Sequence, residues 1–250
     1  MASYVSNMPL WAVLLFILSF LGSIAFIASP AKQAALKAGM TLAKSRNIQI
    51  SIFGFYIGYL GYVSVLSLQG AFVVNSLPPK VMVWGGLPLL IILFGVIGNT
   101  GIFKKLLRSI TLESLVAIHV FRLVGIFFII LYFYHMLPTD FALSAGIGDI
   151  VTALLAVPVA RMISKEKPWH TTAVYAWNIF GILDILTLLV IAVISANRAF
   201  VTGVHGDLDE MAKFPFVWFP AFAPATILFL HTAIFRKLYQ IRVAKAKLSA

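Results

Sequence analysis

Long apolar runs separated by short polar connections dominate the chain. The first extends from Leu10 to Ala28, nineteen residues that would form about 28 Å of helix at a rise of about 1.5 Å per residue. That length matches the hydrocarbon core of a bilayer, where every backbone polar group must be hydrogen-bonded within the protein. Six further runs of similar character follow. We therefore predict seven transmembrane helices, at about 10–28, 48–68, 81–98, 112–137, 141–163, 172–196 and 216–241.

The third of these runs is the most interrupted, because Gly85, Gly86 and Pro88 stand inside it. Glycine weakens a helix, and proline removes one of its backbone hydrogen bonds. The connections between runs are short, and none has the composition of a linker. We predict an all-α fold in which residues 1–250 form one seven-helix transmembrane domain.

The distribution of basic residues alternates from one connection to the next. Fifteen of the 19 Lys and Arg residues lie in the odd-numbered connections and the C-terminal tail. Since cytoplasmic loops carry an excess of Lys and Arg, this pattern predicts an outside N-terminus and a cytoplasmic C-terminus. The fifteen are Lys32, Lys37, Lys44, Arg46, Lys104, Lys105, Arg108, Arg161, Lys165, Lys167, Arg236, Lys237, Arg242, Lys245 and Lys247. The charged residues predicted on the opposite side are Lys80, Asp140, Arg198, Asp207, Asp209, Glu210 and Lys213.

Composition narrows the function classes. The chain is 61% hydrophobic and 11% charged, whereas a soluble domain is about half apolar and about a quarter charged. The absence of cysteine excludes disulfide bonds, thiolate metal sites and cysteine nucleophiles. The net charge of +11 does not predict a nucleic-acid partner, because no segment is long enough to fold a basic surface. The predicted partner is the lipid bilayer.

A few ionisable residues stand inside the apolar runs, where they are expensive and so are candidates for function. By residue count, Arg122, Asp149 and Asp184 each lie near the middle of a predicted helix. We expect Arg122 to pair with Asp149 or Asp184, because an unpaired guanidinium in lipid is untenable. One Arg cannot neutralise two carboxylates, so either one aspartate carries a proton or water reaches the site. A purely structural ion pair that fixes helix register is the alternative.

Further candidates lie close to these three in the sequence. Trp177 precedes Asp184 by one heptad on the same helix face, and Asn178 follows it. Gly146 and Gly148 would let another helix or a ligand approach Asp149. Two prolines in the seventh run, Pro220 and Pro224, would each remove a helix hydrogen bond and so line a cavity or permit gating.

Transport is the function that this polar centre favours. The two aspartates would carry protons or bind a small cationic or polar solute, and the proline breaks would allow the protein to open and close. Arg122, Asp149, Asp184, Asn178 and Trp177 are the candidate binding residues.

Two histidines support a different hypothesis. His119 and His231 come out at similar depth on different helices, and neutral imidazoles from facing helices can ligate b-type haem. A retinal Schiff base is not expected, since the seventh run has no lysine before Lys237 at its cytoplasmic end. The third alternative is a non-catalytic subunit or sensor that binds a membrane-protein partner. Enzyme activity is not predicted, since no nucleophile or metal motif such as His-Glu-x-x-His is present.

One resemblance extends over about the last half of the chain. The stretch His119-Val-Phe-Arg122, followed by Leu137-Pro-Thr-Asp-Phe-Ala-Leu-Ser-Ala-Gly-Ile-Gly-Asp149, resembles a pattern in uncharacterised bacterial membrane proteins. The later Trp177-Asn-Ile-Phe-Gly-Ile-Leu-Asp184 is similar to the same group. The resemblance implies a bacterial inner membrane and carries no known activity.

Overall fold

A computed structural model describes residues 4–73, 76–202 and 208–248, so Asp207 lies outside the described residues. Within them, seven helical spans are long and apolar enough to cross a membrane, which confirms the predicted all-α class and makes this a multi-pass membrane protein. Five of the spans are built on the long helices α1 (Leu10–Lys37), α2 (Leu42–Leu68), α7 (Thr139–Ser164), α8 (His170–Thr202) and α9 (Trp218–Leu248). The third span comprises η1 (Val81–Gly86), α3 (Leu87–Ile91), η2 (Ile92–Val96) and η3 (Ile97–Asn99). The fourth comprises α5 (Leu112–Ala117), η4 (Ile118–Gly125) and α6 (Ile126–Phe133).

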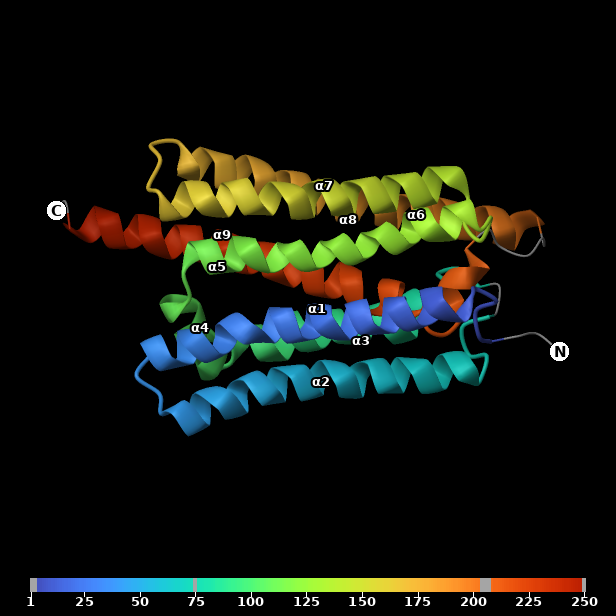
Figure 1. The fold of residues 1–250 in the computed structure, drawn as a ribbon, viewed down its shortest axis with the longest axis horizontal. Helices are drawn as coiled ribbons and strands as arrows, with labels where there is room; N and C mark the ends of the chain where they lie inside the picture. The colour runs from blue at the N-terminus through green and yellow to red at the C-terminus, as the bar shows by residue number, and fades with distance from the viewer. Residues whose placement is uncertain (1–3, 74–75, 203–207, 249–250) are drawn as a thin grey trace.

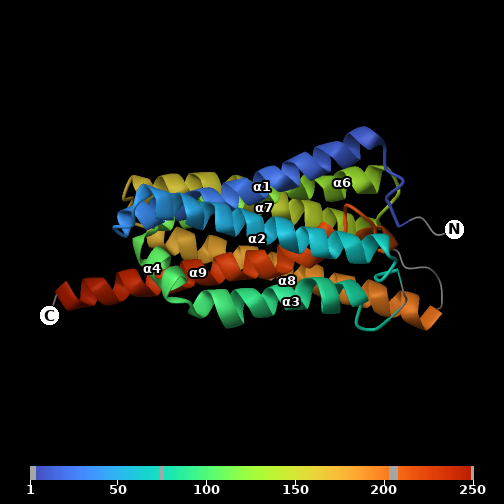
Figure 2. The same cartoon turned by 90° about the horizontal axis from the view of Figure 1, so that it is seen from below.

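The spans run side by side along the long axis of an elongated bundle, with α9 passing between the others (Figures 1 and 2). Burial separates central from peripheral spans. In their most apolar windows, the fourth and seventh spans are each 61% buried, whereas α8 is only 11% buried. Side chains that project inward from η4 and from the middle of α9 therefore lie deep inside the bundle.

The bounds of several helices differ from the sequence prediction, mostly by extension into the connections. The first helix continues through Pro30 to Lys37, and the last continues to Leu248. The predicted fourth helix instead ends at Phe133, four residues early, and His135 adopts a positive φ of 55° just beyond it. A short amphipathic helix, α4 (Gly101–Ser109), occupies a connection that was predicted as a loop.

The sequence predicted one continuous helix for the fourth span, but the structure divides this span into three segments. Eight residues in its middle, η4, form a 3₁₀ helix. Runs of this length are uncommon, because the hydrogen-bond geometry is poorer than in an α-helix, and they often mark hinges. With three residues per turn, side chains three apart are eclipsed, so η4 places His119 directly in line with Arg122.

Tyrosines of α2 form hydrogen bonds with the backbone of the interrupted third span. Pro88 has no N–H, and two π-helical segments, η1 and η2, flank the short α3 that contains it. The hydroxyl of Tyr59 donates to the carbonyl of Gly85 at 2.5 Å and accepts from the N–H of Leu89 at 3.1 Å, so it bridges a donor and an acceptor one turn apart. Tyr62 donates to the carbonyl of Trp84 at 3.2 Å. An inserted side chain of this kind keeps a distorted helix hydrogen-bonded inside the bundle.

The start of α9 packs closely on the third span. A Cβ atom at Gly85 would lie 3.1 Å from the Cβ of Ala221, and one at Gly86 would lie 3.1 Å from the carbonyl oxygen of Pro220. Pro220 is the third residue of α9, where its missing N–H leaves no gap in the helix. The prediction that Pro220 removes a helix hydrogen bond is therefore wrong, and the carbonyl of Phe216, four residues earlier, accepts from Phe219 N at 3.0 Å.

The two ends of the bundle differ in charge. The loop after α1, the helix α4, the α7–α8 loop and the end of α9 all lie at one end, which we call the basic end (Figure 1). At this end Lys237 donates to the carbonyls of Leu107 and Arg108, the last turn of α4, where a positive charge complements the helix dipole. The opposite end, which we call the distal end, contains the described residues between α2 and η1, between α6 and α7, and before α9.

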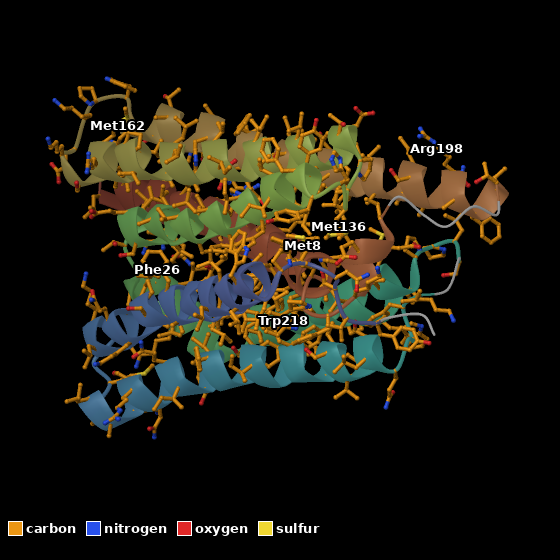
Figure 3. All side chains as sticks on the ribbon, turned by 45° about the vertical axis from the view of Figure 1, so that its right-hand side comes forward. Met8, Phe26, Met136, Met162, Arg198 and Trp218 are labelled. Carbon is orange, nitrogen blue, oxygen red and sulfur yellow. The ribbon has the colours of Figure 1, made fainter. Side chains whose placement is uncertain are left out.

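Side chains fill the space between the helices (Figure 3). Arg198 lies on the part of α8 that projects past the distal end, far from Met162 at the basic end.

Aromatic side chains dominate the interior near the distal end. Phe16 has its ring centroid 4.8 Å from that of Phe216 and 5.1 Å from that of Phe219. Offset and edge-to-face contacts of this kind add to the stabilisation from burial.

Candidate functional site

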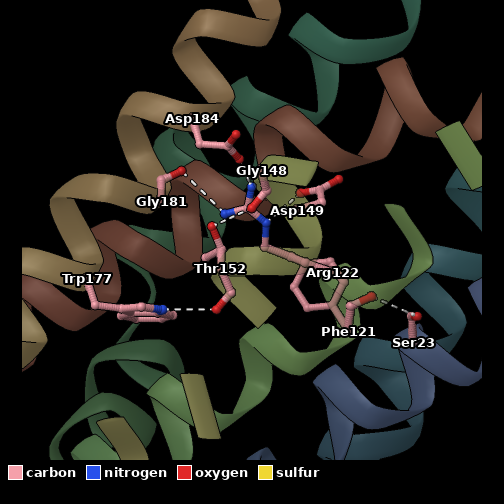
Figure 4. A network of polar contacts seen from close by, with 9 residues as sticks. All are labelled: Ser23, Phe121, Arg122, Gly148, Asp149, Thr152, Trp177, Gly181 and Asp184. Carbon is pink, nitrogen blue, oxygen red and sulfur yellow. Dashed lines mark hydrogen bonds and ion pairs between the residues drawn. The ribbon is translucent and has the colours of Figure 1, made fainter. Parts of the chain in front are cut away.

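A single arginine joins three helical spans at the centre of the bundle. Arg122 in η4 donates from Nε to Oδ1 of Asp149 in α7 at 2.6 Å, and its Nη2 forms an ion pair with Oδ2 of Asp184 in α8. Its Nη1 donates to the carbonyl of Gly181 at 3.4 Å. Figure 4 shows the guanidinium between the two carboxylates. Both aspartates therefore pair with Arg122, where the sequence had predicted one or the other.

Glycines make this close packing feasible. A Cβ atom at Gly148 would collide with the carboxylate of Asp184, and one at Gly125 would collide with the side chain of Asp149. A Cβ atom at Gly146 would lie 2.5 Å from Cδ1 of Ile129. Helices α7, α8 and the fourth span can therefore approach closely enough for Arg122 to contact both carboxylates. Gly146 and Gly148 serve this approach, and neither lines a described cavity.

The two histidines form a second layer beside the ion centre. The rings of His119 and His231 are tilted by 35° with centroids 4.1 Å apart, and Trp177 packs against both. Nδ1 of His231 lies 2.8 Å from Oδ1 of Asn178, whose amide donates to the main-chain carbonyl of His231 at 3.2 Å. Both histidines are completely buried. Among the described residues, neither ring nitrogen of His119 has a hydrogen-bond partner, and nor does Nε2 of His231.

Gly181 connects the two layers. A Cβ atom there would lie 2.5 Å from Nε2 of His231 and 3.2 Å from Nη1 of Arg122. The imidazole and the guanidinium therefore meet across the same glycine. Trp177, one turn earlier in α8, donates from Nε1 to the carbonyl of Thr152 at 3.0 Å, which joins α8 to α7 just below the ion centre (Figure 4).

The histidine pair does not have the geometry of a haem site. An imidazole nitrogen lies about 2 Å from a metal that it ligates, and in a bis-histidine haem the porphyrin lies between the two rings. The centroids of the two rings would then be about 6 Å apart or more. With a centroid separation of 4.1 Å, neither an iron ion nor a porphyrin fits between His119 and His231. Within the described part of the chain, no group of three or more His, Cys, Asp or Glu residues is placed to hold a metal ion.

A cavity of about 130 Å³ reaches from the distal end to Asp149. A buried water needs roughly 10–15 Å³ of cavity volume, so this cavity has room for several waters or a small organic molecule. Its lining comes from η1, α6, α7, α8, η5 (Asp209–Ala212) and α9. Pro220 and Pro224 both line it, as the sequence had suggested for a cavity, and Pro224 lies beyond the first turn of α9. Neither His119 nor Arg122 is among the lining residues.

The structure thus brings together the candidate residues named from the sequence, in two adjoining groups. Arg122, Asp149 and Asp184 form the ion centre, and His119, Trp177, Asn178 and His231 form the layer on its basic side. Sequence reasoning missed Gly125, Thr152 and Gly181. Their spacing was the available signal, because Thr152 and Gly181 each stand three residues from an intramembrane aspartate and so share its helix face.

Comparison with known proteins gives a family and no activity. No curated protein matches the chain, and no solved structure matches it. One protein family does match, over residues 78–239, a segment that includes every residue of the ion centre and of the histidine layer. Because this match spans more than half of the sequence, the chain belongs to the family described as a domain of unknown function (DUF8737).

Proposed function

We propose that this protein carries out proton-linked transport of a small solute, with Asp149 and Asp184 as the proton-binding residues. The observation that carries the proposal is the position of Asp149, which pairs with Arg122 on one side and lines the distal cavity on the other. A carboxylate that is accessible from one end of a membrane bundle, yet joined to its central ion pair, is suited to exchange a proton with that end.

The charge balance of the ion centre supports proton binding. With all three groups ionised, Arg122 and the two aspartates have a net charge of −1. Uptake of one proton makes the centre neutral, and a neutral group is far less costly than a charged one in a low-dielectric interior. A purely structural ion pair would need one carboxylate only, so the second aspartate favours a centre that gains and loses a proton.

Access to the centre is asymmetric. On the distal side the cavity gives access to the ion centre. On the basic side the packed rings of His119, His231 and Trp177 close it. Alternating access would require this layer to separate when the distal cavity closes. The 3₁₀ segment η4 and Pro224 are the two irregular places in the central spans where such a movement could occur.

The proposed orientation follows from charge. We infer that the basic end faces the cytoplasm, because short cytoplasmic loops carry the excess of Lys and Arg. The N-terminus would then lie outside, and the cavity would open away from the cytoplasm. The membrane would be the cytoplasmic membrane of a bacterium, as the resemblance to uncharacterised bacterial membrane proteins implies.

Proton flux through the purified full-length protein tests the proposal. The protein is reconstituted into vesicles that contain a pH-sensitive dye, and an imposed gradient drives protons inward. Wild-type vesicles should acidify faster than empty ones, and Asp149→Asn should remove the difference. Asp140→Asn is the matched control, because Asp140 is an exposed carboxylate in the first turn of the same helix. Equal acidification rates for wild type and Asp149→Asn would refute the proposal.

A further inference from the structure

We propose that the distal cavity binds a small organic cation with an apolar body, held by the carboxylate of Asp149 and by the aromatic rings beside it. This inference rests on the transport function proposed above and names the class of its solute. The cavity combines a buried carboxylate, several aromatic side chains and otherwise mainly apolar walls.

The charge presented to a solute in the cavity is negative. Asp149 lines the cavity, whereas the side chain of Arg122 is completely buried behind it. All three nitrogens of that guanidinium are already engaged, with Asp149, Asp184 and the carbonyl of Gly181. An anion in the cavity would therefore meet a carboxylate before it could reach a free N–H donor. A cation would complete the neutralisation of a centre whose net charge is −1.

The remaining charged residues of the lining do not change this balance. Lys80 at the start of η1 and Asp209 in η5 both line the cavity near the distal end. Their formal charges are opposite and cancel. Asp149 lies deepest, so the lining as a whole has a formal charge of −1 and attracts cations toward its inner end.

Aromatic rings surround the same space. Phe128, Phe141 and Phe219 all line the cavity together with Asp149. The ring of Phe128 stacks on that of Phe219 with centroids 4.1 Å apart, and it meets Phe141 edge-on at 5.8 Å. The face of an aromatic ring attracts a cation, most strongly where water is excluded, and quaternary ammonium groups are recognised in this way.

The other walls favour an organic ion over a hydrated inorganic one. The side of α8 that lines the cavity contributes mainly apolar residues, among them Ile185, Leu188, Leu189 and Ala192. An inorganic cation would have to shed its water against these side chains and would find few oxygen ligands in return. An ammonium group with alkyl or aryl substituents loses little hydration and buries its substituents favourably.

The cation and the transported proton would compete for Asp149. A proton on either Asp149 or Asp184 neutralises the centre and removes the charge that holds the cation. Lys80 and Asp209 are the other charged groups that line this space, Arg122 lies behind Asp149, and none of the three substitutes for the lost carboxylate charge. Cation binding should therefore weaken as the pH falls, which provides the coupling that proton-linked transport requires.

Calorimetric titration of the full-length protein in lipid nanodiscs tests the inference. The probes are benzyltrimethylammonium, benzyl alcohol and benzoate, which share an aromatic body and differ in charge. Benzyltrimethylammonium should bind saturably, and the neutral and anionic compounds should bind at least about tenfold more weakly. Asp149→Asn should weaken binding of the cation by at least about tenfold, whereas Asp140→Asn should not change it.

A second variant keeps the test valid if Asp149→Asn does not fold. Ala192→Phe would fill the cavity from α8 without altering the ion centre, and it should abolish binding of the cation. Binding that is equal for the three probes, or that survives both Asp149→Asn and Ala192→Phe, would overturn the inference.

The flux assay separates this inference from the proposed function. If Asp149-dependent proton flux occurs but benzyltrimethylammonium does not bind, the class of solute is wrong and proton transport stands. If the cation binds through Asp149 but no Asp149-dependent flux occurs, the binding site stands and the transport function is wrong.

Discussion

The imidazole rings of His119 and His231 pack against each other at the core of the bundle, with centroids 4.1 Å apart and a tilt of 35° between the ring planes. Of their four ring nitrogens, only Nδ1 of His231 has a hydrogen-bond partner among the described residues, and that partner is Asn178. Asn178 also donates to the main-chain carbonyl of His231. One amide side chain therefore fixes both the ring and the backbone of the residue that closes the basic side of the ion centre.

Asn178→Ala should destabilise the protein by about 1–3 kcal/mol, because it leaves the buried Nδ1 of His231 without a partner. Thermal unfolding of the detergent-solubilised protein measures the effect. Asn197→Ala is the control, since Asn197 is an exposed asparagine on the same helix. An equal loss of stability in the two variants would show that the contact with His231 contributes nothing.

The ion centre should behave as one energetic unit. Arg122→Gln should cost about 3–5 kcal/mol, because it leaves two carboxylates in the interior without a cation. In an Asp149→Asn/Asp184→Asn background the same change should cost nothing or stabilise the protein, since it removes a buried guanidinium that has lost both carboxylate partners. Chemical unfolding of the four proteins completes the cycle. Additive effects would mean that Arg122 is not coupled to the aspartates.

Two glycine substitutions should have opposite effects. Gly148→Ala should destabilise the protein by about 1–3 kcal/mol, because the new methyl group would occupy the position of the Asp184 carboxylate. Gly54→Ala in α2 should be neutral or stabilising by up to about 1 kcal/mol, because nothing described lies within 4 Å of the added atom and alanine favours a helix. Melting temperatures in one detergent check both. A larger loss at Gly54 than at Gly148 would contradict the packing described for α7 and α8.

The purified protein should have no visible absorption band that shifts on reduction, because the histidine pair leaves no space for a porphyrin. A spectrum recorded in mild detergent before and after dithionite provides the test. A reducible Soret band that disappears in His119→Ala would show that the two rings separate to ligate haem, and it would replace transport with electron transfer.

The sequence alone determined the class of protein and most of the span positions. Apolar runs long enough to cross a bilayer have few other stable structures, because lipid offers no partner for backbone N–H and C=O groups. The same constraint identified Arg122, Asp149 and Asp184 as candidates, since ionisable groups are rare and expensive in the hydrocarbon. These conclusions depend on composition and length, which a linear sequence records directly.

The irregular parts of the spans were beyond the sequence. It showed that Pro88 interrupts the third span, but the repair comes from Tyr59 on another helix. Likewise, nothing in the sequence of η4 predicted a 3₁₀ helix. In the structure this segment packs against α1 and α7. Backbone hydrogen bonds inside a bundle can be satisfied by neighbours, so local propensity does not decide them.

The geometry of the candidate site was decided by tertiary structure. Sequence reasoning paired Arg122 with one aspartate, but the close approach at Gly148 and Gly125 brings both into contact with it. It also offered the histidines as a haem pair in an alternative to transport, whereas their separation depends on how η4 and α9 cross. Distances of this kind are set by the volumes of side chains that meet between helices, and a single sequence does not record which side chains meet.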